Sequence, residues 1–296
     1  MLHALPERIT AERIATVPAE FRRPHPGFTT PNLGAFDCYI EGAAVDGAGN
    51  VLMVDIPASR VLRLTPRGEW STLVEYEGRP KGLKVHRDGR LFISDNRLGI
   101  VVADPQSGKT DVALSRSPYG GFQACNDIAL SRSGNVIFSD QAASCLSEPN
   151  GAVYRWKPDG SVDRLINNAP GPNGLTYNPA ETQIYVAVTR ANAIWRLWLN
   201  ADGTRDKTML FVQMSGGIGP DGIVVDEEDG LIVAHLGVGV WRFDRNGQPT
   251  HFIDTPGGNL CSSVSFGPGG SSTLYVTEAS TGSVFRAEMP YSGVIR

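Results

Sequence analysis

The chain has 296 residues, 41% of them hydrophobic and 20% charged, and a formal net charge of -4 at neutral pH. This balance is typical of a globular protein with an ample core, and it lacks the basic excess expected of a protein that binds nucleic acid or an anionic membrane. No apolar run reaches the roughly 18 residues of a membrane span. Residues 1–31 also lack the apolar centre of a signal peptide, so we expect a cytoplasmic protein.

A short pattern recurs six times along the chain. A polar residue, in most repeats followed by glycine, opens an apolar run that ends at a turn, as in Asp221-Gly222 before Ile223–Val225. The polar positions are spaced 40 to 48 residues apart and are Glu41, Lys81, Asn126, Asn173, Asp221 and Ser262. This period is typical of a β-propeller. We predict an all-β, six-bladed β-propeller with four antiparallel strands per blade, formed by residues 1–296 as a single domain.

In chain order, residues 1–34 are the least regular part, and the blades then occupy about residues 41–289. We expect Glu12–Val17 to be a strand that completes the last blade, because ring closure removes an exposed edge. Blade one begins with strands at Ala43–Val45 and Val51–Val54, separated by a turn rich in glycine and asparagine. The same order repeats in the later blades, and in blade three a longer excursion follows the second strand, over Gln141–Gly151. Helical periodicity is absent over any useful length.

The six polar positions are expected to form a ring. In a propeller the innermost strand of each blade faces the central channel, so the residue just before that strand lies at one mouth. Two carboxylates and two amides converge there, from Glu41, Asp221, Asn126 and Asn173. Such oxygens suit Ca²⁺, or Mg²⁺ or Mn²⁺ with waters, and Zn²⁺ is a further candidate. We predict one divalent metal ion at this mouth; the alternative is that these residues only cap the strand starts.

Three other side chains are candidates for substrate contact. Asp127 replaces the glycine that follows four of the ring positions, and it either orients Asn126 or caps its own turn. The ammonium of Lys81 would need an anion between itself and a cation, such as a substrate carboxylate or an oxyanion; otherwise its side chain bends outward to water. His235 follows the strand Leu231–Ala234 and could face the channel mouth as a proton shuttle or substrate contact.

Several short stretches resemble the senescence-marker-protein/gluconolactonase/luciferin-regenerating-enzyme family of six-bladed propellers, which are calcium-dependent lactonases. They are Glu41-Gly42, Asn126-Asp127, Pro172–Leu175, Pro220–Gly222 and Leu274–Glu278. The architecture is also similar to that of diisopropylfluorophosphatase. The resemblance implies a divalent metal held by Glu41, Asn173 and Asp221, with Asn126 as a fourth ligand or a substrate contact. It also implies hydrolysis of a lactone with Asp221 as base or nucleophile.

The resulting expectation is a metal-dependent lactonase that acts on a small-molecule lactone. Asp221, Asn126 and Lys81 are its expected catalytic residues, and Asn126, Lys81, His235 and Asp127 its expected substrate contacts. Two alternatives stay open: a phosphotriesterase-like hydrolase that uses the same ring on phosphorus, and a non-catalytic propeller that binds a metal or ligand. We expect a monomer or a weak homo-oligomer.

Overall fold

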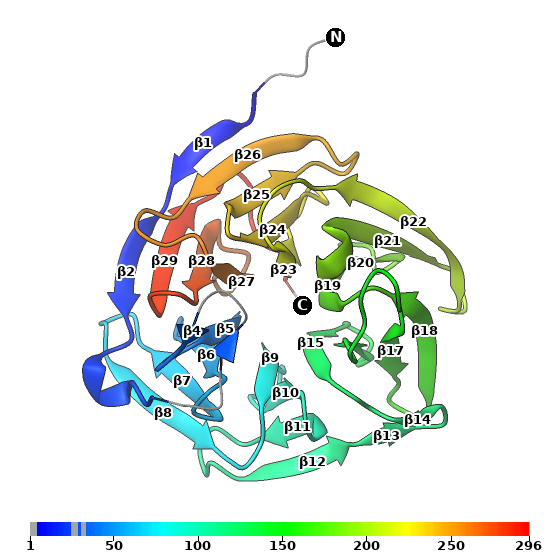
Figure 1. Cartoon of the computed structure of the whole chain (residues 1–296), viewed down its shortest axis with the longest axis horizontal. Coiled ribbons are helices and arrows are strands. Elements are labelled where there is room, and N and C mark those ends of the chain that lie inside the picture. The colour runs from blue at the N-terminus through cyan, green and yellow to red at the C-terminus, as the bar shows by residue number, and fades with distance from the viewer. Residues whose placement is uncertain (1–4, 25–28, 31–33, 296) are drawn as a thin grey trace.

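The computed structural model describes residues 5–24, 29–30 and 34–295. Its strands form six sheets in a ring around a central channel, which confirms the predicted six-bladed β-propeller (Figure 1). Each sheet contains four antiparallel blade strands, with the first strand of the blade innermost. Helix in the described residues is limited to two short 3-10 turns, η1 (Ala19–Phe21) and η2 (Thr189–Ala191).

The blades follow one another in chain order, and within each blade the chain runs from the inner strand to the outer strand. Blade one contains β5 (Ile40–Val45), β6 (Val51–Asp55), β7 (Arg60–Leu64) and β8 (Trp70–Glu75). Blade two contains β9 (Pro80–Val85), β10 (Leu91–Asp95), β11 (Gly99–Ala103) and β12 (Thr110–Leu114), and blade three contains β15 (Cys125–Leu130), β16 (Val136–Asp140), β17 (Gly151–Trp156) and β18 (Val162–Ala169). Blade four contains β19 (Pro172–Tyr177), β20 (Gln183–Val188), β21 (Ala193–Leu199) and β22 (Arg205–Gln213). Blade five contains β23 (Gly219–Val225), β24 (Leu231–Leu236), β25 (Gly239–Phe243) and β26 (Pro249–Asp254), and blade six contains β27 (Cys261–Phe266), β28 (Thr273–Glu278) and β29 (Ser283–Glu288).

The N-terminal segment supplies the outer strand of blade six. Strand β2 (Glu12–Thr16) pairs antiparallel with β29, at the place where the sequence predicts a closing strand. Strand β1 (Glu7–Thr10), which the sequence analysis does not predict, adds a fifth strand to blade five, parallel to β26. The N-terminal segment therefore joins the last two blades and covers the outer edge of each.

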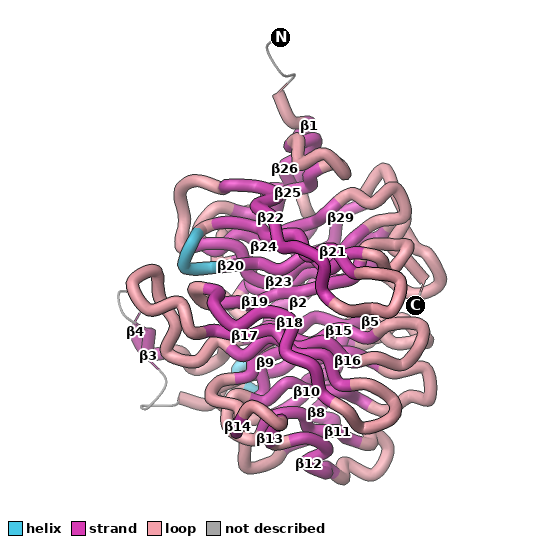
Figure 2. Tube along the Cα trace, turned by 90° about the vertical axis from the view of Figure 1, so that its right-hand side faces the viewer, coloured by secondary structure: helices cyan, strands magenta, loops and turns pink. Residues whose placement is uncertain are grey.

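Two small hairpins stand outside the blades, β3 (Thr29–Thr30) with β4 (Gly34–Ala35), and β13 (Arg116–Ser117) with β14 (Gly120–Gly121). Figure 2 shows β3 and β4 on one face of the ring and the C-terminus on the opposite face. In the view of Figure 1, the C-terminus lies near the centre of the ring. The two faces of the ring therefore carry different parts of the chain.

Apolar side chains fill the space between neighbouring blades. Between blades one and two, Leu52 and Val54 pack in one cluster with Leu83 and Ile93. All four alternate with residues that point to the other face of their sheet, as the two-residue period of a strand requires. Among the residues that the structure describes, none belongs to a helix long and apolar enough to traverse a lipid bilayer.

Acidic residues at the end of several second strands hold the loops that lead into the inner strands. The Asp95 carboxylate accepts hydrogen bonds from the backbone N–H groups of Arg79, Arg97 and Leu98, at 2.7 to 2.9 Å. Asp140 and Glu278 accept backbone N–H groups in the same way in blades three and six. Each carboxylate therefore fixes the backbone just before the polar position of its own blade, because a buried N–H group needs a partner.

Candidate functional site

The six polar positions of the repeat lie near the start of the six innermost strands. Each innermost strand carries a β-bulge there, either at the polar residue or directly after it. The sequence analysis placed these residues just before the strands, which is wrong, because strand pairing begins before each bulge and resumes after it. A bulge contains one extra residue, so it bends the strand and re-aims the side chain at that point.

Glycine follows four of these positions because neighbouring inner strands approach closely. A Cβ atom on Gly174 would lie 2.2 Å from the backbone carbonyl oxygen of Asp221. One on Gly42 would lie 2.7 Å from the carbonyl oxygen of Lys81. Both distances are too short for a carbon–oxygen contact, so only glycine allows this approach of two backbones. The glycines thereby bring the polar residues of adjacent blades together.

Lys81 turns towards the ring. Its Nζ lies 3.5 Å from Glu41 Oε1, so the ammonium of blade two meets the carboxylate of blade one. The Lys81 side chain is 19% exposed, and the expectation that it bends outward to water is not met. The positive charge partly neutralises the acidic side of the ring without a direct hydrogen bond at this distance.

Glu41 and Asp221 are the two carboxylates of the ring, and each is 6% exposed. Burial raises the pKa of Asp221 well above its usual range, and the charge of Glu41 raises it further, while the Lys81 ammonium opposes both effects. Burial also raises the pKa of Glu41, with Lys81 lowering it and Asp127 adding to the rise. The ring therefore holds two carboxylates whose ionisation is costly unless a positive charge is near.

Asn173 and Asn126 supply the amides of the ring. Asn173 Nδ2 donates to Thr189 Oγ1 at 3.1 Å, and Thr189 Oγ1 donates to the carbonyl oxygen of Pro220 at 2.7 Å. The first bond orients the amide plane and leaves Asn173 Oδ1 as a free acceptor. Asn126 is buried, and its side-chain amide forms no hydrogen bond with the part of the chain that the structure describes. Both amides can therefore offer an oxygen to a ligand.

Asp127 lies beside the ring and caps its own turn. Its Oδ1 accepts a hydrogen bond from the N–H of Ile128 at 2.8 Å, and the N–H of Leu175 in the next blade also bonds to its carboxylate. Burial raises the pKa of Asp127, while the charge of Lys84 opposes the rise. Asp127 thus links two blades, and its negative charge adds to that of the ring.

Ser262 and His235 take part in the fold around the ring. Ser262 Oγ donates to the carbonyl oxygen of Ile40 at 2.7 Å and so ties blade six to blade one. His235 is 1% exposed and lies opposite Pro220 in the neighbouring strand, with Nε2 3.1 Å from the carbonyl oxygen of Gly216. Burial lowers the pKa of His235, so its imidazole is uncharged at neutral pH. Nε2 then carries the proton and donates to the Gly216 carbonyl oxygen. His235 Nδ1 is buried, and no described residue forms a hydrogen bond with it.

The sequence analysis misses the hydroxyl side chains that support the ring. Ser94 Oγ accepts the N–H of Gly82 at 3.0 Å and donates to the carbonyl oxygen of Asn126, which joins blades two and three. Ser139 Oγ accepts the N–H of Asp127 at 3.0 Å. The signal that could have identified them is a Ser/Thr-acid pair at the end of the second strand, in Ser94-Asp95, Ser139-Asp140 and Thr277-Glu278.

Tyr39 is another residue that the sequence analysis does not identify. It is buried two residues before Glu41, and burial raises its pKa well above the usual range, with the charges of Glu41 and Asp221 adding to the rise. The phenol therefore stays protonated and close enough to both carboxylates to feel their charge.

The residues at this mouth fit a divalent cation. Glu41 Oε1 is buried and forms no hydrogen bond that meets normal geometry with the described residues, and its ion-pair partner Lys81 stays 3.5 Å away, which leaves the oxygen able to contact a cation. The donors are two carboxylates and two amides, which are the hard oxygen ligands of Ca²⁺ and Mg²⁺. Over residues 5–24, 29–30 and 34–295, no group of three or more His, Cys, Asp or Glu side chains is arranged to hold a metal. A cation here would therefore depend on the two amides as well as the two acids.

Comparison with known proteins gives a consistent picture. The family model described as the SMP-30/gluconolactonase/LRE-like region matches residues 40–280. Gluconolactonase of Zymomonas mobilis is 28% identical, over 77% of this chain and 73% of its own length. Lactonase drp35 of Staphylococcus aureus is 26% identical, over 74% of this chain and 70% of its own. Among solved structures, the calcium-binding protein regucalcin of Agrobacterium tumefaciens has the same fold, with a TM-score of 0.76 and 21% identity over 99% of this chain and 98% of that one.

Proposed function

This chain belongs to the SMP-30/gluconolactonase/LRE-like family, and on that premise we propose that it is a divalent-metal-dependent hydrolase that opens the ring of a small lactone. Relatives named gluconolactonase and lactonase support lactone hydrolysis as the activity. The observation in the structure that carries the proposal is the pair of buried carboxylates, Glu41 and Asp221, whose charges act on each other, with the Asn173 side chain hydrogen-bonded to Asp221.

Glu41, Asn173 and Asp221 would hold the metal ion, with Asn126 as a fourth ligand or a substrate contact. We propose Ca²⁺ as the ion, because all these donors are oxygens and Ca²⁺ accepts carboxylate and amide oxygens in a flexible shell. The neighbour regucalcin, described as a calcium-binding protein, points to the same ion. Zn²⁺ suits the site less well, because it prefers nitrogen and sulfur ligands.

The chemistry of lactone opening assigns separate tasks to the side chains. A bound divalent cation would polarise the lactone carbonyl and offset the negative charge that develops on its oxygen. Asp221 is the group that takes a proton from the attacking water at a carboxylate oxygen, or attacks the carbonyl carbon itself. When water attacks, the ring C–O bond breaks and the released oxygen takes the proton from Asp221, which gives the hydroxy acid. When Asp221 attacks, cleavage of the ring C–O bond leaves an acyl–Asp221 anhydride, and a water molecule then hydrolyses it to the hydroxy acid and restores the carboxylate.

Asn126 and Lys81 would stabilise negative charge on the substrate. The Asn126 amide is free of hydrogen bonds to the described residues and can donate Nδ2–H to the carbonyl oxygen as it becomes an oxyanion. The Lys81 ammonium, which meets Glu41 at 3.5 Å, can reorient towards an anion of the substrate. Burial of the ring excludes bulk water and strengthens each of these interactions.

A panel of lactones tests the proposal. The purified protein would be assayed after chelation and after return of Ca²⁺, Mg²⁺, Mn²⁺ or Zn²⁺, with aldonolactones, simple aliphatic lactones and lactones that carry a carboxylate. We expect hydrolysis that chelation abolishes and Ca²⁺ restores. Turnover that survives full chelation would contradict the metal role, and absence of turnover on the whole panel would contradict the lactonase. A parallel organophosphate ester would reveal a phosphotriesterase instead.

A further inference from the structure

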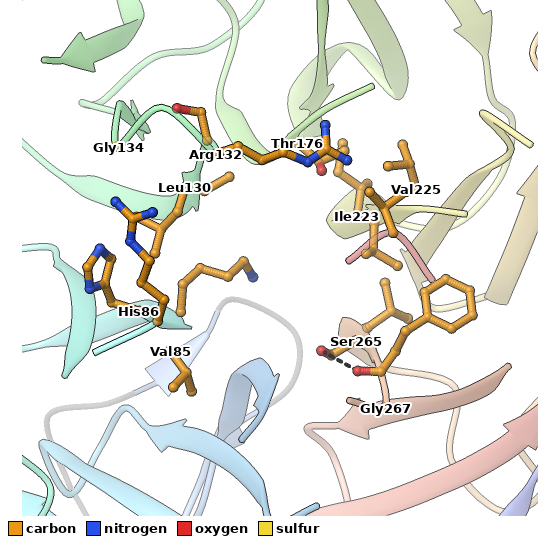
Figure 3. Close-up of a pocket in the computed structure, with 18 residues that line it drawn as sticks. Val85, His86, Leu130, Arg132, Gly134, Thr176, Ile223, Val225, Ser265 and Gly267 are labelled. Atoms are coloured by element: carbon orange, nitrogen blue, oxygen red, sulfur yellow. Dashed lines mark hydrogen bonds between the residues drawn. The ribbon is translucent and has the colours of Figure 1, made fainter. Parts of the chain in front are cut away.

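A cavity lies at the mouth of the central channel opposite to the candidate metal ligands. It has a volume of about 290 Å³ and is lined by the last residues of inner strands, among them Val85, Leu130 and Val225 (Figure 3). The candidate metal ligands lie at the starts of the same strands, so the two sites face opposite ends of the channel. Val294 of the C-terminal segment also lines this cavity, on the face that Figure 2 shows to carry the C-terminus.

Lys84 is the charged group at the inner end of the cavity. It lies three residues after ring position Lys81, and the residues three after the other ring positions are small, apolar or hydroxylated. They are Ala44, Ala129, Thr176, Val224 and Ser265, and all but Ala44 also line the cavity. The Lys84 charge acts on the buried Asp127 carboxylate, and no described residue forms a direct ion pair or hydrogen bond with Lys84 Nζ. A partly buried ammonium that lacks a direct ion pair is favoured by an anionic ligand beside it.

The charged groups that line the outer part of the cavity have the same sign. Arg87 and Arg132 line it together with His86, and the lining contains no acidic side chain from the described residues. Arg132 donates to the carbonyl oxygens of Pro179 and Ile295, so it is held across the rim. His86 is engaged with Asp88 at 2.8 Å. Lys84 and Arg87 therefore remain as the cations of the cavity that form no direct ion pair or hydrogen bond with the described residues.

The rest of the lining is apolar. Val85, Val224 and Val294 are partly exposed and form the apolar wall of the cavity, whereas Ile223, Val225 and Val264 are buried in the cores between blades. Figure 3 shows Ile223 and Val225 on one side of the opening and Val85 and His86 on the other. The cavity thus combines cationic with apolar side chains, and its volume lies at the lower end of the range of about 300–1,000 Å³ for ligand pockets.

We propose that this cavity binds a small organic acid, whose carboxylate meets Lys84 and Arg87 and whose short apolar body packs on Val85, Val224 and Val294. The apolar wall leaves an inorganic anion without contacts on that half of the cavity. The site is separate from the proposed lactonase centre and its existence does not depend on that activity.

Hexanoate is a suitable probe, since it joins one carboxylate to a five-carbon chain. Calorimetric titration of the metal-free protein should give saturable binding with a dissociation constant of about 1 mM or below. Hexanamide, which has the same shape without the charge, and inorganic phosphate, which has charge without the chain, should each bind at least about tenfold more weakly. Equal binding of hexanamide would contradict the role of the cations, and equal binding of phosphate would contradict the role of the apolar wall.

Variants locate the site. Lys84→Met should weaken hexanoate binding at least about tenfold, and Lys84→Arg should retain it, because only the first removes the charge. Lys207→Met is the matched control, since Lys207 lies on outer strand β22 with its side chain 58% exposed. Methyl NMR shifts on titration should appear at Val85, Val224 and Val294.

Binding at the metal site would overturn the inference. A carboxylate probe held there would require Ca²⁺ and would be lost in Glu41→Gln, whereas the cavity site should bind hexanoate in the metal-free wild type and in Glu41→Gln alike. Unchanged affinity in Lys84→Met would also overturn it, as would the absence of saturable binding by the wild type.

Discussion

Lys81 Nζ lies 3.5 Å from Glu41 Oε1, so the ammonium of blade two is close to the place that a cation bound by Glu41 would occupy. The same charge lowers the pKa of Glu41 and of Asp221 against the effect of burial. Lys81 therefore stabilises the ionised forms of both carboxylates, as a bound metal ion would. When an ion binds, the ammonium and the ion repel each other unless an anion lies between them.

The first prediction is that Lys81→Met binds Ca²⁺ about tenfold more tightly than the wild type, a change of about 1.4 kcal/mol, because the variant removes a like charge and an ion-pair partner of Glu41. Calorimetric titration of the chelated proteins measures this. Lys109→Met serves as control, since its side chain is 75% exposed in a turn between outer strands. An unchanged or weaker affinity in Lys81→Met would show that the lysine does not compete with the ion.

The second prediction concerns the close approach of the inner strands. Gly174→Ala should lower the free energy of unfolding by about 2 kcal/mol or more, because its Cβ would lie 2.2 Å from the Asp221 carbonyl oxygen and force the strands apart. Gly47→Ala is the control, since a Cβ there has no neighbour within 4 Å, and its effect should stay below about 0.5 kcal/mol. Urea unfolding measures both; equal effects would contradict the packing argument.

The third prediction follows from the buried His235. Burial lowers its pKa below the ordinary value of 6.5, so the unfolded chain takes up the proton first as the pH falls. The stability that His235 contributes is present above pH 6.5 and is lost as the pH falls through this value towards the folded pKa. His235→Gln keeps a donor for Gly216 but does not titrate.

The free energy of unfolding should therefore fall less between neutral pH and about pH 5 in His235→Gln than in the wild type. His251→Gln is the comparison, because burial also lowers the pKa of His251 but Glu7 opposes the change. We expect its effect on the pH dependence to be smaller. Identical pH profiles for the wild type and His235→Gln would contradict the buried, neutral ring.

The repeat period was enough to predict the blades, because each polar position marks one inner strand. It could not show the β-bulges, since a bulge is a mismatch between two strands and leaves no fixed pattern in either one. The bulge at Cys125–Ile128, for example, appears only when β15 is paired with β16. The direction of the Lys81 side chain was also beyond the sequence, because it depends on the carboxylate that the previous blade places beside it.

Strand β1 shows a second limit. Closure of the ring requires a partner for β29, and that requirement pointed to Glu12–Val17. No such requirement exists for β26, so the parallel strand β1 could be found only in three dimensions. The supporting hydroxyls of Ser94 and Ser139 could be predicted only in part. Their Ser-Asp pattern is present in the sequence, but it is recognised only after the structure shows what the hydroxyls bind.

The last prediction separates metal binding from chemistry at the two ring carboxylates. Glu41→Gln and Asp221→Asn each remove one of the two formal negative charges, so each should weaken Ca²⁺ binding. The proposed roles then differ, because only Asp221 acts on the attacking water or the carbonyl carbon. In Glu41→Gln, turnover of a lactone substrate should therefore recover when excess Ca²⁺ refills the site.

In Asp221→Asn, the amide retains an oxygen for the ion but has neither the basicity nor the nucleophilicity of a carboxylate. We expect kcat to fall by roughly 10²-fold or more at saturating Ca²⁺, the usual scale for loss of an acid–base group. Calorimetry establishes that each variant is loaded with Ca²⁺, and steady-state kinetics on the same samples gives kcat. Near-normal turnover by calcium-loaded Asp221→Asn would remove Asp221 from the chemistry. Failure of excess Ca²⁺ to restore Glu41→Gln would assign Glu41 a role in the reaction beyond holding the ion.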